Sequence, residues 1–106
     1  MINGIYLYSL ESCFPLGKRR GKLEIHINGE RVSGFIKMFA RRNPLKGILK
    51  DDLIDFSGEF GGLFYELPFK AKGKINADLI EFDLITEKGT FHTVGKFETN
   101  RGEHYD

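Results

Sequence analysis

The sequence predicts an all-β fold, an eight-stranded antiparallel up-and-down meander closed into a barrel. Polar and apolar residues alternate along most of the chain, as in Leu23, Ile25 and Ile27 with their polar neighbours, and a period of two is typical of half-buried strands. No segment places apolar residues at the spacing of an amphipathic helix over three turns. The 13 glycines, most of them two positions before an apolar residue, indicate the bends that curl a sheet into a barrel.

The expected strands are short and joined by tight turns, which allows the sheet to close and removes its exposed edges. Asn28-Gly29 is the strongest hairpin signal, because both residues tolerate the positive φ of a type I′ turn. Residues 47–56 and 73–82 repeat Gly, Asp, Leu, Ile and Phe at the same offsets, which indicates two similar hairpins. A two-sheet sandwich fits the same alternation. The expected strands span residues 3–11, 21–28, 30–39, 45–50, 52–60, 63–75, 78–86 and 90–98.

A single domain is expected over residues 1–98, followed by a polar tail at 99–106. The net charge of +1 in 106 residues argues against nucleic acid or a membrane surface as the main target. The single cysteine, Cys13, excludes a disulfide framework and a multi-thiolate zinc site. The sequence has neither a long apolar run nor the order of a signal peptide, so we expect a cytoplasmic protein without membrane contact.

Motifs that support catalysis are missing from the sequence. It contains no nucleotide-binding glycine loop, no paired histidines of the zinc-protease kind and no calcium loop. His26, His92 and His104 are scattered, and no base accompanies Cys13. We therefore expect a protein that is not an enzyme and has no cofactor and no metal. The carboxylates and lysines of the second half are interpreted as a solvated face with cross-strand ion pairs; they are Asp55, Glu59, Glu66, Lys70, Lys72, Glu81 and Asp83.

Charge is divided unevenly between the two halves of the chain. Residues 1–50 carry a net charge of +7 and residues 51–106 a net charge of −6. Successive loops of a meander alternate between the two barrel ends, so loops 12–20 and 40–44 share one end. Loop 12–20, the longest expected connection, is expected to fold as a lid over that barrel mouth, where basic side chains suit a carboxylate or phosphate. The residues expected to bind an anion there are Phe14, Lys18, Arg19, Arg20, Arg41, Arg42 and Lys46.

Three segments carry a resemblance to a known family: residues 3–6 (Asn-Gly-Ile-Tyr), the hairpin 21–29 followed by Gly34, and residues 47–54. Together they resemble the GrlR-type bacterial regulators, which are small lipocalin-like β-barrels of the calycin architecture. The resemblance implies a dimeric barrel that binds a partner transcription regulator and uses an acidic turn in recognition. Asp51 and Asp52 fall at the corresponding turn of this sequence.

Three function hypotheses follow from these observations. The first is a small protein-binding regulatory barrel, monomeric or homodimeric, which contacts its partner through a barrel face or through Asp51-Asp52. The second is a carrier or sensor of a small amphipathic anion held inside the barrel, since eight strands leave room for one small ligand. The third is weak binding of single-stranded nucleic acid, with aromatic rings stacking on the bases; the candidate rings are Phe14, Phe35, Phe39 and Phe69.

Overall fold

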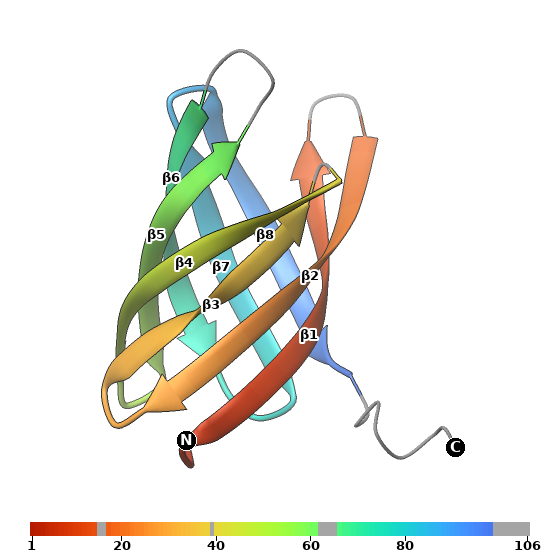
Figure 1. Cartoon of the computed structure of the whole chain (residues 1–106). Helices are drawn as coiled ribbons and strands as arrows, with labels where there is room; N and C mark the ends of the chain where they lie inside the picture. Colours follow the sequence, from red (N-terminus) through yellow and green to blue (C-terminus); the bar gives the residue numbers. More distant parts are fainter. Residues whose placement is uncertain (15–16, 39, 62–65, 99–106) are drawn as a thin grey trace.

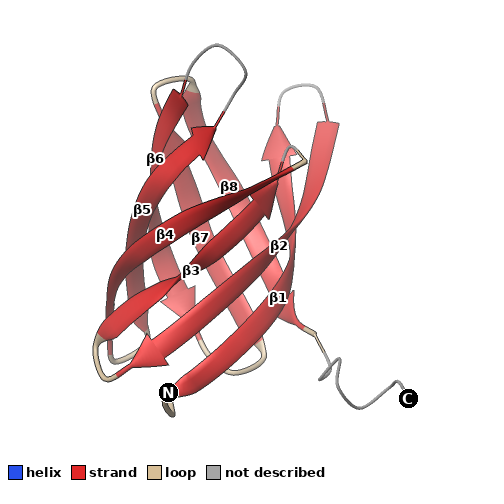
Figure 2. Ribbon diagram, viewed as in Figure 1, coloured by secondary structure: helices blue, strands red, loops and turns tan. Residues whose placement is uncertain are grey.

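The computed structural model describes residues 1–14, 17–38, 40–61 and 66–98. Each strand pairs antiparallel with the next along the chain, and the last strand pairs with the first, so that the sheet closes into a barrel (Figure 1). Figure 2 shows short turns at the connections drawn in tan, and the described residues contain no helix. The predicted closed meander is therefore confirmed, and the sandwich is excluded. The strands are β1 (Gly4–Phe14), β2 (Gly17–Asn28), β3 (Arg31–Met38), β4 (Arg41–Lys50), β5 (Leu53–Gly61), β6 (Glu66–Ile75), β7 (Leu79–Thr86) and β8 (Gly89–Phe97).

Side chains fill the interior of the barrel. The alternation seen in the sequence puts Leu23 and Ile25 inside with no exposed surface, while Glu24 between them lies on the outer face. Aromatic rings pack at the centre, with the ring centroids of Phe56 and Phe82 5.3 Å apart. Every apolar side chain of the core cluster exposes 6 % of its surface or less, so water has no access to the middle of the barrel.

The internal repeat in the sequence corresponds to a repeated close approach between strands. Gly47 on β4 lies directly opposite Phe56 on β5, and Gly73 on β6 lies directly opposite Phe82 on β7. A Cβ atom on either glycine would stand 1.9 Å from a backbone carbonyl oxygen of the facing strand. Only glycine lets the two backbones come so close, and the approach bends the sheet toward closure.

The first tight turn lies one residue later than the sequence indicates. Asn28 still belongs to β2 and pairs with Arg31, so Gly29 and Glu30 form the turn. Gly29 has a φ of 66°, and Asn28 and Glu30 have no positive φ. The expected type I′ turn at Asn28-Gly29 is therefore wrong, because a single positive φ at the first central position is the requirement of a type II′ turn.

The expected long loop at 12–20 is also wrong. The β1–β2 ladder continues up to Phe14 paired with Gly17. Pro15 and Leu16, which belong to the expected lid, lie between these two residues and outside the described part of the chain. This end of the hairpin runs beyond the pairing of β2 with β3, which stops at Lys22. Residues 17–20 of β2 are exposed on both faces, so this part of the sequence carries no alternation and looks like a loop.

Two prolines lie inside strands at positions with one partner strand each. Pro44 on β4 pairs with Phe35, whereas the ladder from β4 to β5 begins one residue later. Pro68 on β6 pairs with Glu59, whereas the ladder from β6 to β7 begins at the next residue. Sheets tolerate proline where one side of a strand has no ladder. The expected loop at 40–44 is thus strand from Arg41 onward.

Asn43 joins β4 to β5 where their backbones part. Its side chain is buried, and its Oδ1 accepts a hydrogen bond of 2.9 Å from the backbone N–H of Gly61. Its Nδ2 donates to the carbonyl oxygens of Ile36 and Arg41, each at 3.3 Å. The amide therefore gives the Gly61 N–H an acceptor beyond the point where the β4–β5 ladder ends.

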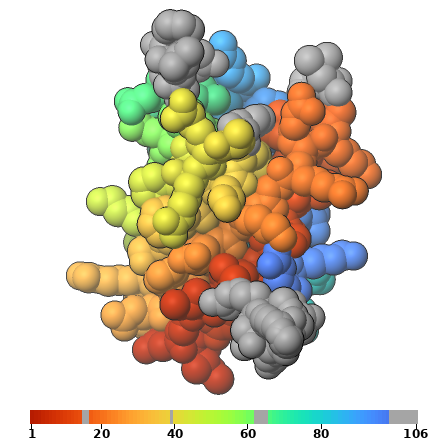
Figure 3. All heavy atoms as spheres, turned by 45° about the vertical axis from the view of Figure 1, so that its right-hand side comes forward, coloured from red at the N-terminus to blue at the C-terminus, as the bar shows by residue number. Residues whose placement is uncertain are grey.

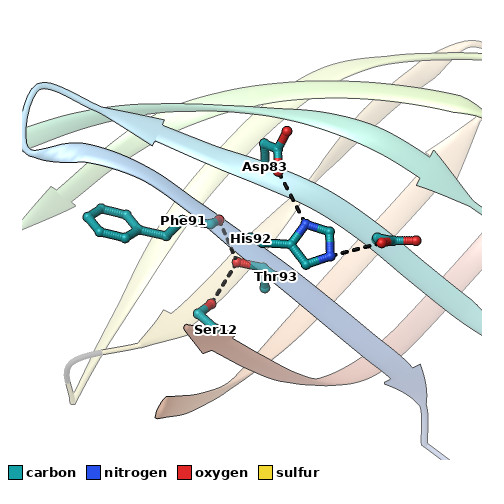
Figure 4. Close-up of polar contacts among 6 residues, drawn as sticks. Ser12, Asp83, Phe91, His92 and Thr93 are labelled. Atoms are coloured by element: carbon teal, nitrogen blue, oxygen red, sulfur yellow. Dashed lines mark hydrogen bonds and ion pairs between the residues drawn. The ribbon is translucent and has the colours of Figure 1, made fainter. Parts of the chain in front are cut away.

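The seam between β1 and β8 is short. It runs from Tyr8 paired with Phe97 to Ser12 paired with Thr93. At its end the buried hydroxyls of Ser12 and Thr93 lie 2.7 Å apart, and the Thr93 hydroxyl donates to the Phe91 carbonyl oxygen at 3.2 Å (Figure 4). The Ser12 hydroxyl is then the donor to Thr93, so both buried hydroxyls are satisfied.

Candidate functional site

The outer surface of β2, β3 and β4 carries a row of like charges. Lys22 on β2 lies directly opposite Lys37 on β3, and Lys37 lies directly opposite Arg42 on β4. Like charges directly opposite one another destabilise a sheet. We call Lys22, Phe35, Lys37, Arg42 and Lys46 the basic face, which lies on the orange and yellow strands turned forward in Figure 3.

An aromatic ring lies under one end of this row. The guanidinium carbon of Arg42 is 3.7 Å from the centroid of the Phe35 ring. Phe35 is half-buried and lies between Glu24 on β2 and Pro44 on β4 in the register. A guanidinium stacked on a ring is held flat and keeps its N–H donors at its edge, an arrangement that suits a carboxylate.

Two grooves follow the basic face. The upper groove has a volume of about 270 Å³ and is lined by Lys22, Glu24, Phe35, Lys37, Arg42 and Glu98, with Leu7, Tyr8 and Leu23 at its floor. The lower groove, of about 730 Å³, lies farther along the same strands and includes His26, Arg31, Ser33 and Lys46. The face is thus furrowed along the direction of the strands.

One acidic side chain reaches the row from another strand. Glu98 follows β8, and its carboxylate forms an ion pair with Lys22 and accepts a hydrogen bond of 2.6 Å from the Ser9 hydroxyl. Glu24, the other carboxylate of the upper groove, contacts His26 at 2.6 Å. Among the described residues, neither Lys37 nor Arg42 forms an ion pair. The positive charge of the row is only partly balanced.

The opposite side of the barrel balances its charges. Lys72 on β6 lies between Asp55 on β5 and Asp83 on β7, and Asp83 lies opposite His92 on β8. The two ring nitrogens of His92 contact Glu81 at 2.8 Å and Asp83 at 3.2 Å (Figure 4). Opposite charges alternate across these strands, as expected from the sequence for this half of the chain.

The anion-binding residues expected from the sequence fall into separate groups. Lys18 and Arg20 on β2 both turn toward Glu11 on β1, at 3.6 and 3.9 Å. Arg19, between them, is exposed and pairs with Ser12 in the backbone ladder.

The two remaining arginines, Arg41 and Arg42, both lie on β4 but point to different faces of it. Arg42 and Lys46 lie on its outer face. Arg41 alternates with them and lies toward the barrel mouth, with its Cδ atom 3.8 Å from the place of a Cβ on Gly61. The ring of Phe14 packs on that of Phe91 at 4.5 Å, against the core.

The acidic turn lies at the other end of the barrel. Asp51 and Asp52 connect β4 to β5, at the end that also holds the β2–β3 turn and the N-terminus (Figure 1). Both side chains are exposed, and the backbone carbonyl of Asp52 accepts a hydrogen bond of 2.9 Å from the N–H of Ile75. Asp51 has a φ of 57°. The structure thus places this turn apart from the expected basic mouth.

The buried polar groups of the interior have structural partners. The Tyr8 hydroxyl donates a hydrogen bond of 2.8 Å to the carbonyl oxygen of Asn76, in the connection between β6 and β7. Burial, with smaller contributions from Tyr6 and Asp78, raises the pKa of Tyr8 above its ordinary value. Its hydroxyl is therefore a hydrogen-bond donor at neutral pH.

Cys13 is exposed on β1, where it pairs with Lys18 on β2 in the backbone ladder.

Sequence reasoning missed Lys22, Lys37 and Glu98 as site residues. A signal for the two lysines exists, because the turn at Gly29-Glu30 sets the register of β2 on β3 and brings positions 22 and 37 together. Glu98 gives no comparable signal, since its contact with Lys22 depends on how β8 closes against β1.

No protein-family model matches this chain, and no curated protein matches it significantly. Within the described ranges, no helix is long and apolar enough to cross a membrane, and no group of three or more His, Cys, Asp or Glu side chains is arranged to hold a metal ion.

Proposed function

We propose that this barrel is a non-catalytic binding module whose basic face docks an acidic segment of a partner protein. The observation that carries the proposal is the row of Lys22, Lys37 and Arg42 in direct cross-strand register. Such a row weakens the isolated sheet, whereas carboxylates of a partner turn the repulsion into attraction. The repulsion destabilises the free barrel and is relieved in a complex, which supports a binding role.

The outer face is favoured over the interior as the binding surface. The side chains of the core cluster leave the interior closed to water, with rings such as Phe60 and Phe69 packed 4.5 Å apart. A ligand inside the barrel would need several of these side chains to move. The basic face needs no such change, because its grooves are open at the surface.

An acidic protein segment suits this face better than single-stranded nucleic acid. Base stacking needs free aromatic surfaces. Phe35 is the one phenylalanine or tyrosine on the outer face of the described parts of β2, β3 and β4, and Arg42 covers its ring. Of the other candidate rings, Phe69 is buried in the core and Phe39 lies outside the described residues.

The resemblance to GrlR-type regulators supports the same class of function. A lipocalin-like regulatory barrel of that kind would act in a bacterial cytoplasm, form a homodimer and bind a regulator protein. In this proposal the basic face is the partner site, and Asp51 and Asp52 at the far end of the barrel remain available for a second contact.

A peptide-binding experiment tests the proposal. A fluorescent peptide of about twelve glutamates is titrated with the barrel at low ionic strength, where electrostatic attraction is least screened, and its anisotropy is recorded. We expect the double variant Lys37→Ser/Arg42→Ser to bind at least about tenfold more weakly, which corresponds to ~1.4 kcal/mol. The matched control is Lys70→Ser/Lys72→Ser on β6, which removes the same charge from the opposite side.

The control variant should change the affinity by less than about twofold. Equal losses in the two variants would show a response to net charge alone and would contradict a defined docking face. An oligothymidine of similar charge is tested as a competitor of the labelled peptide. If it displaces the peptide at a lower concentration than the unlabelled peptide does, the proposed ligand is single-stranded nucleic acid and not an acidic protein segment.

A further inference from the structure

We infer that Glu98 is an internal ligand of the basic face, whose carboxylate occupies the position that a carboxylate of the acidic partner segment takes on binding. The inference rests on the proposed function and names both the group that the face recognises and the residue that competes for it. The group recognised is a carboxylate, and the competitor is part of the barrel itself.

The backbone fixes Glu98 beside the basic face. Its N–H donates a hydrogen bond of 2.8 Å to the carbonyl oxygen of Leu7 on β1. This bond extends the pairing of β8 with β1 by one step past Phe97. Glu98 is consequently held at the β1 edge of the face, with β1 and β2 between it and Lys37 on β3.

The side chain of Glu98 reaches over β1 to β2. Its Oε2 accepts a hydrogen bond of 2.6 Å from the Ser9 hydroxyl and pairs with the ammonium group of Lys22. Ser9 and Lys22 lie directly opposite each other in the β1–β2 ladder, and the Lys22 ammonium also donates to the Ser9 hydroxyl at 3.2 Å. The three side chains form a closed set around one carboxylate oxygen.

This carboxylate lies at one end of an anion-binding row. Glu98, Lys37 and Arg42 line the same groove of about 270 Å³, and Arg42 is held over Phe35 at the other end. Lys37 and Arg42 have no ion-pair partner among the described residues. The contact between Glu98 and Lys22 therefore shows how the face binds a carboxylate. The other two cations of the row, Lys37 and Arg42, remain for further carboxylates.

Displacement of Glu98 is energetically feasible. The side chain of Lys22 is 59 % exposed and that of Glu98 is 24 % exposed, and ion pairs at such positions contribute little to stability. The negative charge also lowers the potential along the whole row, because Lys37 and Arg42 line the same groove as Glu98. Removing that charge should strengthen the binding of an acidic segment.

The test compares Glu98→Gln with the matched control Glu59→Gln. Both variants remove one negative charge and keep the size of the side chain, but Glu59 lies on β5, opposite Pro68 and outside the upper groove. With the labelled glutamate peptide at low ionic strength, we expect Glu98→Gln to bind about three- to tenfold more tightly than the unmodified barrel. Glu59→Gln should stay within about 1.5-fold, since its carboxylate lies outside the groove that holds Lys22, Lys37 and Arg42.

A second arm measures the competition directly. In the unmodified barrel Glu98 already neutralises Lys22, so Lys22→Ser should weaken peptide binding only slightly. In the Glu98→Gln background, where the peptide has Lys22 to itself, the same substitution should remove most of the gain in affinity. This non-additivity is the signature of two carboxylates that compete for one ammonium group.

The outcomes separate the inference from the proposed function. If the peptide binds, and Lys37→Ser/Arg42→Ser weakens it while Glu98→Gln leaves the affinity unchanged or lower, the internal-ligand inference is overturned and the docking face stands. If neither the unmodified barrel nor Glu98→Gln binds the peptide, both are overturned. Equal gains from Glu98→Gln and Glu59→Gln would reduce the effect to net charge and also overturn the inference.

Discussion

Gly73 lies directly opposite Phe82, so close that a Cβ on the glycine would stand 2.5 Å from the Cα of the phenylalanine. The same relationship holds for Gly47 and Phe56 one hairpin earlier. The repeated contact is built from backbone atoms on both sides, and a side chain cannot relieve it by changing rotamer. A methyl group at either position therefore forces a shift of the backbone.

Gly73→Ala should destabilise the barrel by about 3 kcal/mol or more, because the added methyl group forces the facing strand away. The free energy of unfolding is measured by urea denaturation. Gly61→Ala is the matched control, since the nearest atom to a Cβ there is 3.8 Å away. A control that destabilises as much as Gly73→Ala would show that the loss comes from glycine at any strand position and not from the close approach.

Ala40→Gly should stabilise the barrel by about 0.5–1 kcal/mol. Ala40 has a φ of 62° in the connection between β3 and β4, a left-handed conformation that is unfavourable for a residue with a Cβ. Glycine relieves this strain and loses part of the gain to its larger freedom in the unfolded chain. Ala71→Gly, at a buried position of β6, should have the opposite sign. A lower midpoint of thermal unfolding for Ala40→Gly would refute the expectation.

Asn43→Ala should destabilise the barrel by about 1–3 kcal/mol, because the backbone N–H of Gly61 loses its acceptor in a partly buried place. Asn28→Ala, at an exposed position of β2, should cost less than about 0.5 kcal/mol. Amide hydrogen exchange gives a local readout, and the Gly61 N–H should exchange faster in Asn43→Ala than in the unmodified protein. Unchanged protection of this amide would mean that the side-chain bridge is not formed in solution.

Tyr8→Phe should make stability less dependent on pH in the alkaline range. The raised pKa of Tyr8 means that the folded state keeps the phenolic proton where the unfolded state, with a pKa of about 10, releases it. Its contribution is complete below pH 10 and is lost as the pH rises toward the folded-state pKa, by up to ~1.4 kcal/mol per pH unit.

The unfolding free energy of Tyr8→Phe should thus fall less steeply above pH 10 than that of the unmodified protein. Tyr6→Phe is the comparison, because the Tyr6 hydroxyl donates to the Ile2 carbonyl at an exposed site. Equal slopes for Tyr8→Phe and the unmodified protein would contradict the assignment.

The parts of the fold that the sequence predicts are those where one strand face is covered and the other is not. Leu23, Ile25 and Ile27 show the alternation and point inward as expected. The alternation disappears at residues 17–20, because both faces of β2 are exposed there, and the strand at these residues was not predicted. The strand around Pro44 escaped prediction for another reason, since a break in one ladder permits a residue that otherwise marks a loop.

The candidate site divides in the same way. Arg42 and Lys46 were expected to bind an anion, and their basic character is evident from the sequence alone. The row with Lys22 and Lys37 needs the strand register as well, which depends on a turn that lies one residue from its expected place. The contact of Glu98 with Lys22 joins residues from opposite ends of the chain, and no local pattern encodes such a contact.

The short β1–β8 seam has a kinetic consequence. Seven of the eight ladders join strands that follow each other in the chain and can form as local hairpins, whereas the seam must bring together Ser12 and Thr93. The loss of chain entropy on closing so long a loop makes this the last ladder to form. It should also be the first to open in the native state, so that the barrel fluctuates into an open, curved sheet whose two free edges are β1 and β8. Edge strands of that kind pair readily with other chains, and the buried hydroxyl pair of Ser12 and Thr93 thus opposes this edge-to-edge association.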